Sequence, residues 1–289
     1  FIMLKNIQTM KDFVINEIDA LPPLPKTILE LQRICAQEHS SIKQVANVIE
    51  QDPFLTIDLI KSANSPLYGY HREINSILQA VSLFGISTAK GLAIASAIKA
   101  KFVINLTPYN IEVSQFVDTS NIKNAFLCRW QQKNIHLLEI LVPCALVMHI
   151  GMVIISNCLK QSGKQEEFMQ NINSHQFLEI EQNLLGYNQF EVLEHLFEHW
   201  NFEETMVQVV HYLNSPTLPK ELQIYIYPLR VLNALINPYE IASEAQILKA
   251  RNLVQQYQLD LASFDTTLED MRLNPAPTLP EEDYPLVDE

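Results

Sequence analysis

The chain has 289 residues, and its 48% share of hydrophobic residues is enough for a sizeable packed core. Only six glycines occur, whereas an average usage of roughly 7% would give about 20. Because all-β folds need glycine in many turns, this scarcity favours helices. The formal charge of −13 repels phosphate backbones, and the longest basic stretch is Lys99-Ala100-Lys101, so we expect no nucleic-acid binding.

The cysteines indicate a reducing environment. None has C-x-x-C spacing, and all lie in apolar stretches with a helical pattern: Cys35, Cys128, Cys144 and Cys158. We interpret them as reduced core residues rather than ligands or disulfide partners. With no signal-peptide pattern at the start of the sequence, we expect a cytoplasmic protein.

Proline and capping residues mark the first helices. Pro25 suits the first turn of a helix, and Ser40 or Ser41 suits the cap before the next. Asp52 followed by Pro53 predicts a third helix start. A carboxylate there accepts backbone N–H groups, and the N–H that proline lacks is not needed in the first turn.

Two further helices complete the predicted N-terminal lobe, residues 1–108. An amphipathic pattern over 74–84 predicts one helix, with Gly85 as the left-handed residue after its end. The next helix should begin just after Gly85 and run to about Phe102. Helices of about 10 to 14 residues are unstable alone, so we expect these to pack as a bundle.

Residues 109–216 predict a second helical lobe around a long apolar helix. The segment 140–159 is twenty residues without a charge, about the length that crosses a bilayer. Pro143 and His149 interrupt it and no basic cluster flanks it. We therefore interpret it as a buried core helix and expect no membrane span.

The remainder of the chain predicts an extension and a tail. Residues 217–273 continue the helical pattern, and we expect these helices to pack on the second lobe. Residues 274–289 hold four prolines and five acidic residues, which predicts a solvated or loosely docked tail. The expected fold class is therefore all-α, a two-lobed helical bundle.

One short string resembles a zinc site. The sequence His195-Leu196-Phe197-Glu198-His199 matches H-x-x-E-H, in which two histidines bind zinc and the glutamate acts as a base. The apolar stripe of this helix lies roughly opposite both histidines, so we expect them to face water on a charged surface. His149, inside the apolar segment, predicts a hydrogen-bonded core histidine. No glycine-rich phosphate loop or G-x-S-x-G motif occurs in the sequence.

Four motifs in the first lobe resemble a known family. They are Leu21-Pro22-Pro23-Leu24-Pro25, Ile49-Glu50-Gln51-Asp52-Pro53-Phe54-Leu55, Ala63-Asn64-Ser65-Pro66-Leu67-Tyr68-Gly69 and Gln79-Ala80-Val81-Ser82-Leu83-Phe84-Gly85. In this order and spacing they closely resemble the HD-related output domain (HDOD) family, over about residues 21–216. The resemblance implies structural roles for Leu24, Pro25, Asp52, Pro53, Asn64, Ser65, Ala80 and Gly85.

The HDOD family is similar to the HD and HD-GYP phosphohydrolases, whose histidines and aspartate surround a metal pair. By this resemblance, Thr119 replaces the first histidine and Met148-His149 replaces a His-Asp dyad. Gln189 replaces a later histidine, and Tyr212 falls at a His-His pair. We call these five residues the HD positions. They are too poor in ligands for a metal pair, so we expect no metal, no cofactor and no enzymatic activity.

The resemblance, rather than the composition, predicts the function. We expect a non-catalytic output or scaffold module of bacterial signal transduction that acts through contacts with signalling proteins. The identity of the partner and the oligomeric state are not predicted. Two alternatives stay open: a metal-dependent HD-type phosphohydrolase, and a small-ligand sensor with an apolar residual pocket beneath Met148 and His149.

Overall fold

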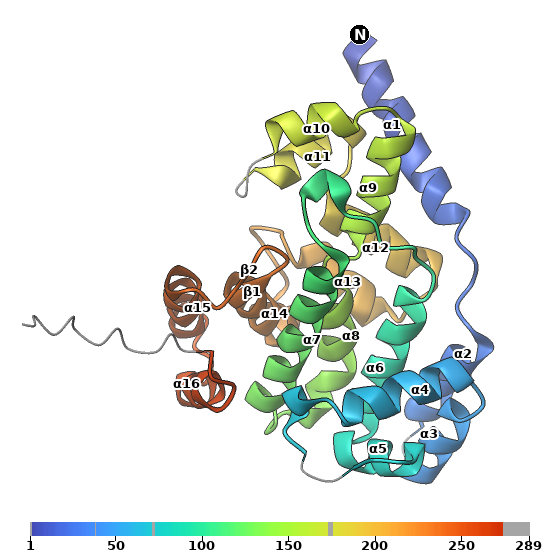
Figure 1. Cartoon of the computed structure of the whole chain (residues 1–289), viewed down its shortest axis with the longest axis vertical. Helices are drawn as coiled ribbons and strands as arrows, with labels where there is room; N and C mark the ends of the chain where they lie inside the picture. Colours follow the sequence, from blue (N-terminus) through green and yellow to red (C-terminus); the bar gives the residue numbers. More distant parts are fainter. Residues whose placement is uncertain (1, 38, 71–72, 173–175, 274–289) are drawn as a thin grey trace, which may run out of the picture.

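Helices make up most of the computed structural model, which describes residues 2–37, 39–70, 73–172 and 176–273 (Figure 1). The part of the chain up to Tyr109 contains α1 (Ile2–Asp19), α2 (Lys26–Cys35), α3 (Ile42–Ile49), α4 (Pro53–Ala63), η1 (Pro66–Tyr68), α5 (Ile77–Phe84), α6 (Ile86–Lys99) and η2 (Thr107–Tyr109). The predicted all-α, two-lobed fold class is confirmed.

The second lobe and the extension follow. They contain α7 (Val113–Trp130), η3 (Ile135–Leu137), α8 (Leu138–Val147), α9 (Gly151–Gln161), α10 (Gln165–Asn171), α11 (Phe177–Leu185), α12 (Gln189–His199), α13 (Glu204–Tyr212), η4 (Lys220–Leu222), α14 (Gln223–Leu235), α15 (Glu244–Gln256) and α16 (Leu261–Asp270). Within the described residues the strands are β1 (Ile236–Asn237) and β2 (Glu240–Ile241), which form a short antiparallel hairpin.

Two helices tie the lobes together. Helix α1 packs against α9, α11 and α12 at the end of the molecule far from α2–α5 (Figure 1). Helix α6 packs along α8 on one side and against α2, α4 and α5 on the other. Lys90 of α6 is buried and forms ion pairs with Glu139 of α8 at 3.6 Å and with Glu203, just before α13, at 3.4 Å. The buried apolar side chains of both lobes therefore form one continuous core.

Most of the predicted helix starts are correct. The Asp52 carboxylate accepts hydrogen bonds from the backbone N–H groups of Phe54 and Leu55 at 3.0 and 3.2 Å, and Pro53 occupies the first turn. Ser41, rather than Ser40, caps α3. The prediction for Pro25 was wrong by one position: it precedes α2 as the cap residue, with an extended ψ of 144°.

Gly85 has the predicted positive φ, 77°, but its ψ of 163° is extended rather than left-handed helical. The reason is that Gly85 ends α5 and begins α6 at once, and the two helix axes bend by 116° there. Helix α6 ends at Lys99, a few residues before the predicted end at Phe102.

The cap at Asp52 allows a direct test of the motif. Replacing Asp52 with alanine should lower the free energy of unfolding by about 1 kcal/mol, because two N–H groups of the first turn lose their acceptor. Urea denaturation measures this loss, with Glu50→Ala as a control that removes the same charge close by. An Asp52→Ala protein as stable as the control would contradict the cap.

We predicted one helix for the long apolar segment, but the structure has two. Helix α8 ends at Val147 and α9 begins at Gly151, and the intervening turn has i→i+3 hydrogen bonds, including Ile150 N–H to the Val147 carbonyl at 2.9 Å. In the window of this region that is long and apolar enough to cross a membrane, 94% of the residues are buried within the protein. This is the burial expected of a core helix.

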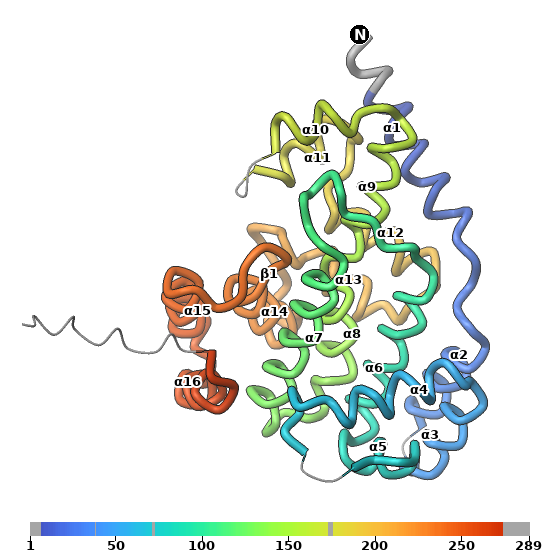
Figure 2. Tube along the Cα trace, in the orientation of Figure 1, coloured from blue at the N-terminus to red at the C-terminus, as the bar shows by residue number. Residues whose placement is uncertain are grey.

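The helices of the extension, residues 217–273, contact helices of the second lobe. Helix α14 contacts α7, α8 and α13, while α15 lies on α14 and α16 lies on α7. Phe264 of α16 packs between Phe126 and Trp130, with ring centroids 5.3 Å from each. Figure 2 shows how the chain turns back from α15 to place α16 beside α7. The predicted tail, 274–289, lies outside the described residues.

Candidate functional site

The motif residues of the first lobe hold its backbone in place. Asn64 pairs in both directions with the backbone of Ile74: its amide oxygen accepts the Ile74 N–H, and its amide nitrogen donates to the Ile74 carbonyl, both at 2.8 Å. Ser65 accepts from the N–H of Leu67, which lies in η1. Leu24 and Ala80 are buried in the core.

The structure brings only some of the HD positions together. The break between α8 and α9 places His149 beside Gln189, the first residue of α12, with 2.7 Å between His149 Nδ1 and Gln189 Oε1. Thr119 donates its hydroxyl to the Phe116 carbonyl of its own helix, α7, at 3.0 Å. Tyr212 packs against the His211 ring and lines a different cavity, beside Glu194 and Glu198.

Both ring nitrogens of His149 are engaged. The second, Nε2, lies 2.9 Å from the Asn233 side-chain amide of α14, which belongs to the extension. The pKa of His149 is lowered to about 3, mainly by burial and also by the Lys123 charge, while the hydrogen bonds to Gln189 and Asn233 oppose this shift. Both contacts are to amide oxygens, which only accept, and a neutral imidazole carries one N–H, so His149 donates to one of the two. His149 is thus the hydrogen-bonded core histidine that the sequence predicted.

A buried carboxyl group binds Gln189, the hydrogen-bond partner of this histidine. Glu181 of α11 accepts the Tyr109 hydroxyl and the Gln189 backbone N–H, each at 2.7 Å. Burial raises the pKa of Glu181 to about 8 despite these hydrogen bonds. Tyr109, Glu181, Gln189, His149 and Asn233 therefore form a continuous chain of buried or partly buried polar groups from η2 to α14.

A lysine lies on the other side of the break. Lys123 of α7, one turn after Thr119, is 1% exposed, and its Nζ lies 3.6 Å from the thioether sulfur of Met148. Burial lowers the pKa of Lys123 to about 7. Sulfur of this kind is only a weak acceptor, so the ammonium has little compensation for the water it has lost.

These residues do not fit the metal pair of the HD phosphohydrolases. The Thr119 hydroxyl bonds its own helix, Met148 contacts an ammonium group, and both His149 nitrogens are engaged. Over the described ranges, no group of three or more His, Cys, Asp or Glu side chains is placed to hold a metal ion. Hard cations need free oxygen and imidazole ligands, whereas the hydroxyl, imidazole and amide groups here are hydrogen-bonded within the protein.

The two histidines of the H-x-x-E-H string do not both face water, contrary to our prediction. The His195 side chain is 30% exposed, bonds Glu198 at 3.2 Å and packs edge-on against Tyr187. The His199 side chain is 20% exposed, with Nε2 3.1 Å from the Leu21 carbonyl. The prediction failed because α1 and the chain after it cover this side of α12. His211 pairs with Glu194 at 2.7 Å.

A cavity of about 380 Å³ opens beside His149, between the second lobe and the extension. Phe177, Phe190 and Tyr239 supply aromatic walls, while Asn214 and Asn233 supply amides. This cavity is more polar than the residual pocket we predicted, and Met148 is not part of its lining. The difference arises because Asn233 and Tyr239 belong to the extension, whose position the motifs do not encode.

Several residues around His149 escaped the sequence analysis. Lys123 lies in a helix with a polar composition, where a lysine ordinarily faces water. Glu181 and Asn233 belong to no motif, and they lie 32 and 84 residues from His149. The sequence did give one sign of these residues. His149 lies in an apolar segment, and a buried histidine needs polar partners for its two ring nitrogens.

Comparison with known proteins agrees with the motifs. The HDOD domain family matches residues 21–216. The fold resembles the crystal structure of a virulence factor from Campylobacter jejuni, with 28% sequence identity, a TM-score of 0.59 and coverage of 92% of this chain and 98% of that one. It also resembles a protein from Shewanella amazonensis, provisionally named a phosphohydrolase, with 21% identity, a TM-score of 0.65 and coverage of 90% and 94%.

A sequence relative matches over a shorter length. An uncharacterized protein of Treponema pallidum is 30% identical over 79 residues, which are 27% of this chain and 15% of that relative. The match thus spans a small part of the relative's length. Because the HDOD family match extends over more than half of the sequence and coincides with the four motifs, the chain belongs to the HDOD family.

Proposed function

We propose that this chain is a non-catalytic output or scaffold module of bacterial signal transduction that acts through protein–protein contacts. The observation that supports the proposal is the use of the HD positions inside the fold. Both nitrogens of His149 are bonded to amides, and the ammonium of Lys123 lies against Met148. A metal ion would have to displace these interactions and would meet a nearby positive charge.

The surface of the first lobe carries exposed apolar side chains that suit a protein contact. Phe54 and Ile57 lie one turn apart on α4 and are 82% and 50% exposed. Large apolar side chains on one exposed helix face are a common feature of interaction sites. Phe54 lies inside one of the family motifs, so this motif supplies a surface residue as well as the Asp52 cap.

The second candidate function is a metal-dependent phosphohydrolase, and the name of the Shewanella protein favours it. Metal content and hydrolysis separate the two. We expect protein purified without a chelator and without a histidine tag to hold well under one metal ion per chain. Its melting temperature should not change with EDTA or with added Mn²⁺, and bis(p-nitrophenyl) phosphate should not be hydrolysed above background.

The control for this measurement is His149→Ala, which removes the histidine at the HD positions. Any trace hydrolysis that persists in this variant comes from a contaminant. Stoichiometric metal together with hydrolysis that His149→Ala abolishes would refute the non-catalytic proposal. That result would mean that His149 belongs to a metal site.

A further inference from the structure

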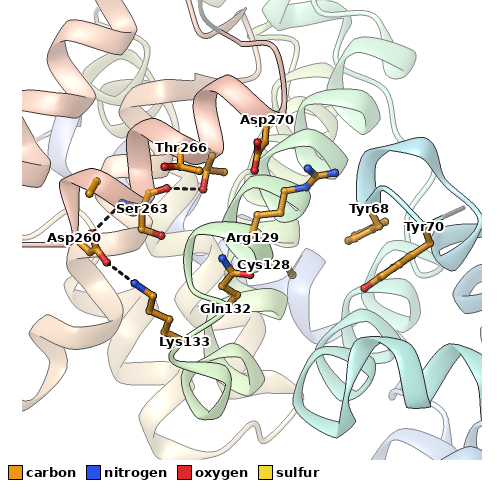
Figure 3. Close-up of a pocket in the computed structure, with 12 residues that line it drawn as sticks. Tyr68, Tyr70, Cys128, Arg129, Gln132, Lys133, Asp260, Ser263, Thr266 and Asp270 are labelled. Atoms are coloured by element: carbon orange, nitrogen blue, oxygen red, sulfur yellow. Dashed lines mark hydrogen bonds and ion pairs between the residues drawn. The ribbon is translucent and has the colours of Figure 1, made fainter.

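A third cavity lies where the HDOD segment meets the extension (Figure 3). It has a volume of about 590 Å³ and lies between the chain around η1, the last turns of α7, and α16. Small-molecule sites have volumes of this order. None of the HD positions lines it. It is therefore a separate site, and its properties do not depend on the function proposed above.

Arg129 of α7 is the main charged group of this cavity. Its Nη2 donates to the Leu67 carbonyl at 2.8 Å, and its Nε is buried with no hydrogen-bond partner among the described residues. In the part of the chain that the structure describes, no ion pair involves this guanidinium. Arginine has five N–H donors, so Arg129 has donors to spare. In Figure 3 its guanidinium extends between Tyr68 and Asp270.

The backbone of the first lobe is shaped around this guanidinium. Gly69 has a φ of 71°, and a Cβ atom at this position would lie 2.9 Å from Arg129 Nη2. The Leu67 carbonyl holds the same nitrogen. The motif that ends at Gly69 therefore positions Arg129, whereas an ordinary surface arginine has no such support.

The other charged residues that line the cavity are Lys133, Asp260 and Asp270. Lys133 and Asp260 neutralise each other in an ion pair at 3.4 Å. Asp270 is exposed at the end of α16 and has no ion pair among the described residues. Thr266 of α16 brings a hydroxyl group to the lining. The cavity thus combines one unpaired guanidinium and a hydroxyl with one opposing carboxylate.

We propose that this cavity binds a small molecule through an oxyanion, a carboxylate or a phosphate, with Arg129 as the principal contact. Guanidinium groups bind such anions through two parallel hydrogen bonds. Asp270 repels the same anion and so keeps its affinity low. Since the lining comes from both η1 and α16, the bound anion holds the extension against the first lobe.

Titrations of the full chain with malonate and with inorganic phosphate test this proposal. The ionic strength is held constant with sodium chloride, and the Nε–H signal of Arg129 is followed by ¹⁵N NMR. We expect saturable shifts with at least one probe, and the stronger of the two identifies the anion. Arg129→Met should weaken binding by about ten- to a hundredfold, the usual effect of losing a charged hydrogen bond. Asp270→Asn should strengthen it.

Arg33→Met is the matched control, because Arg33 is an exposed arginine of α2 outside this cavity. It should bind both probes as the natural chain does. If Arg129→Met does not fold, Arg129→Lys keeps the charge but loses the planar fork and should still bind more weakly. Linear shifts with both probes, unchanged affinity in the Arg129 variants, or weaker binding in Asp270→Asn would each overturn the proposal.

Discussion

Replacing Lys123 with methionine should raise the free energy of unfolding at about pH 6 by about 3–5 kcal/mol. The pKa of Lys123 is lowered from its ordinary 10.5 to about 7 by burial. Below pH 7 the folded chain must hold a buried ammonium that the unfolded chain leaves in water. Methionine keeps a similar length and packs against Met148 without a charge, so the variant should not suffer this penalty.

The sign of the effect gives a pH test. Between pH 7 and 10.5 the unfolded lysine is protonated and the folded one is not, so the penalty from Lys123 falls as pH rises. The advantage of Lys123→Met should therefore be largest below pH 7 and nearly vanish by about pH 10. Urea denaturation across this range measures it. Glu181 titrates near pH 8 in both proteins, so their difference isolates Lys123.

Lys133→Met serves as the control for this experiment. Its side chain is 75% exposed on the surface just after α7, and its removal should change stability little at any pH. An equal gain at all pH values would mean that packing, not charge, explains the Lys123→Met result. A loss of stability below pH 7 would mean that the ammonium has a favourable partner.

Replacing Gly151 with alanine should destabilise the protein by about 3 kcal/mol or more, because the new Cβ has no space. It would lie 2.1 Å from the backbone oxygen of Gln189, and a backbone atom cannot rotate away as a side chain can. Helices α9 and α12 would have to separate. That movement would also disturb the hydrogen bond between His149 Nδ1 and the Gln189 side-chain oxygen, leaving a buried polar group unsatisfied.

Gly163→Ala is the matched control, measured with Gly151→Ala by thermal and urea unfolding. Gly163 has a φ of 71°, but a Cβ atom added there would meet nothing within 4 Å, so only conformational strain of about 1 kcal/mol is expected. The stability loss at Gly151 should be clearly larger. Equal small losses in both variants would show that the close approach of α9 and α12 is not rigid.

Local interactions explain why the helix starts were predictable. Asp52 and Ser41 cap helices through bonds to N–H groups two or three residues away, so the whole interaction lies within one short stretch of sequence. The break between α8 and α9 was not predictable in this way. Gly151 is needed there because α12 approaches its backbone. The sequence of residues 140–159 contains no information on where α12, which begins 38 residues after Gly151, will lie.

The same distinction applies to the candidate site. The family resemblance identified His149 and Gln189, which the structure places in contact. It could not identify Lys123, whose burial depends on how α7 packs against α8. The error at His195 and His199 has a similar cause. Helical periodicity separates an apolar stripe from a polar one, but it does not show whether another helix covers the polar side.

Lys90 has a consequence for the order of events during synthesis. Its ammonium is buried on α6, but one of its two carboxylate partners, Glu203, lies 113 residues later in the chain. A nascent chain emerging from the ribosome must therefore wait until Glu203 appears before this charge has both partners. The ion pairs of Lys90 on α6 are therefore complete only when the chain near the end of the HDOD segment has been made.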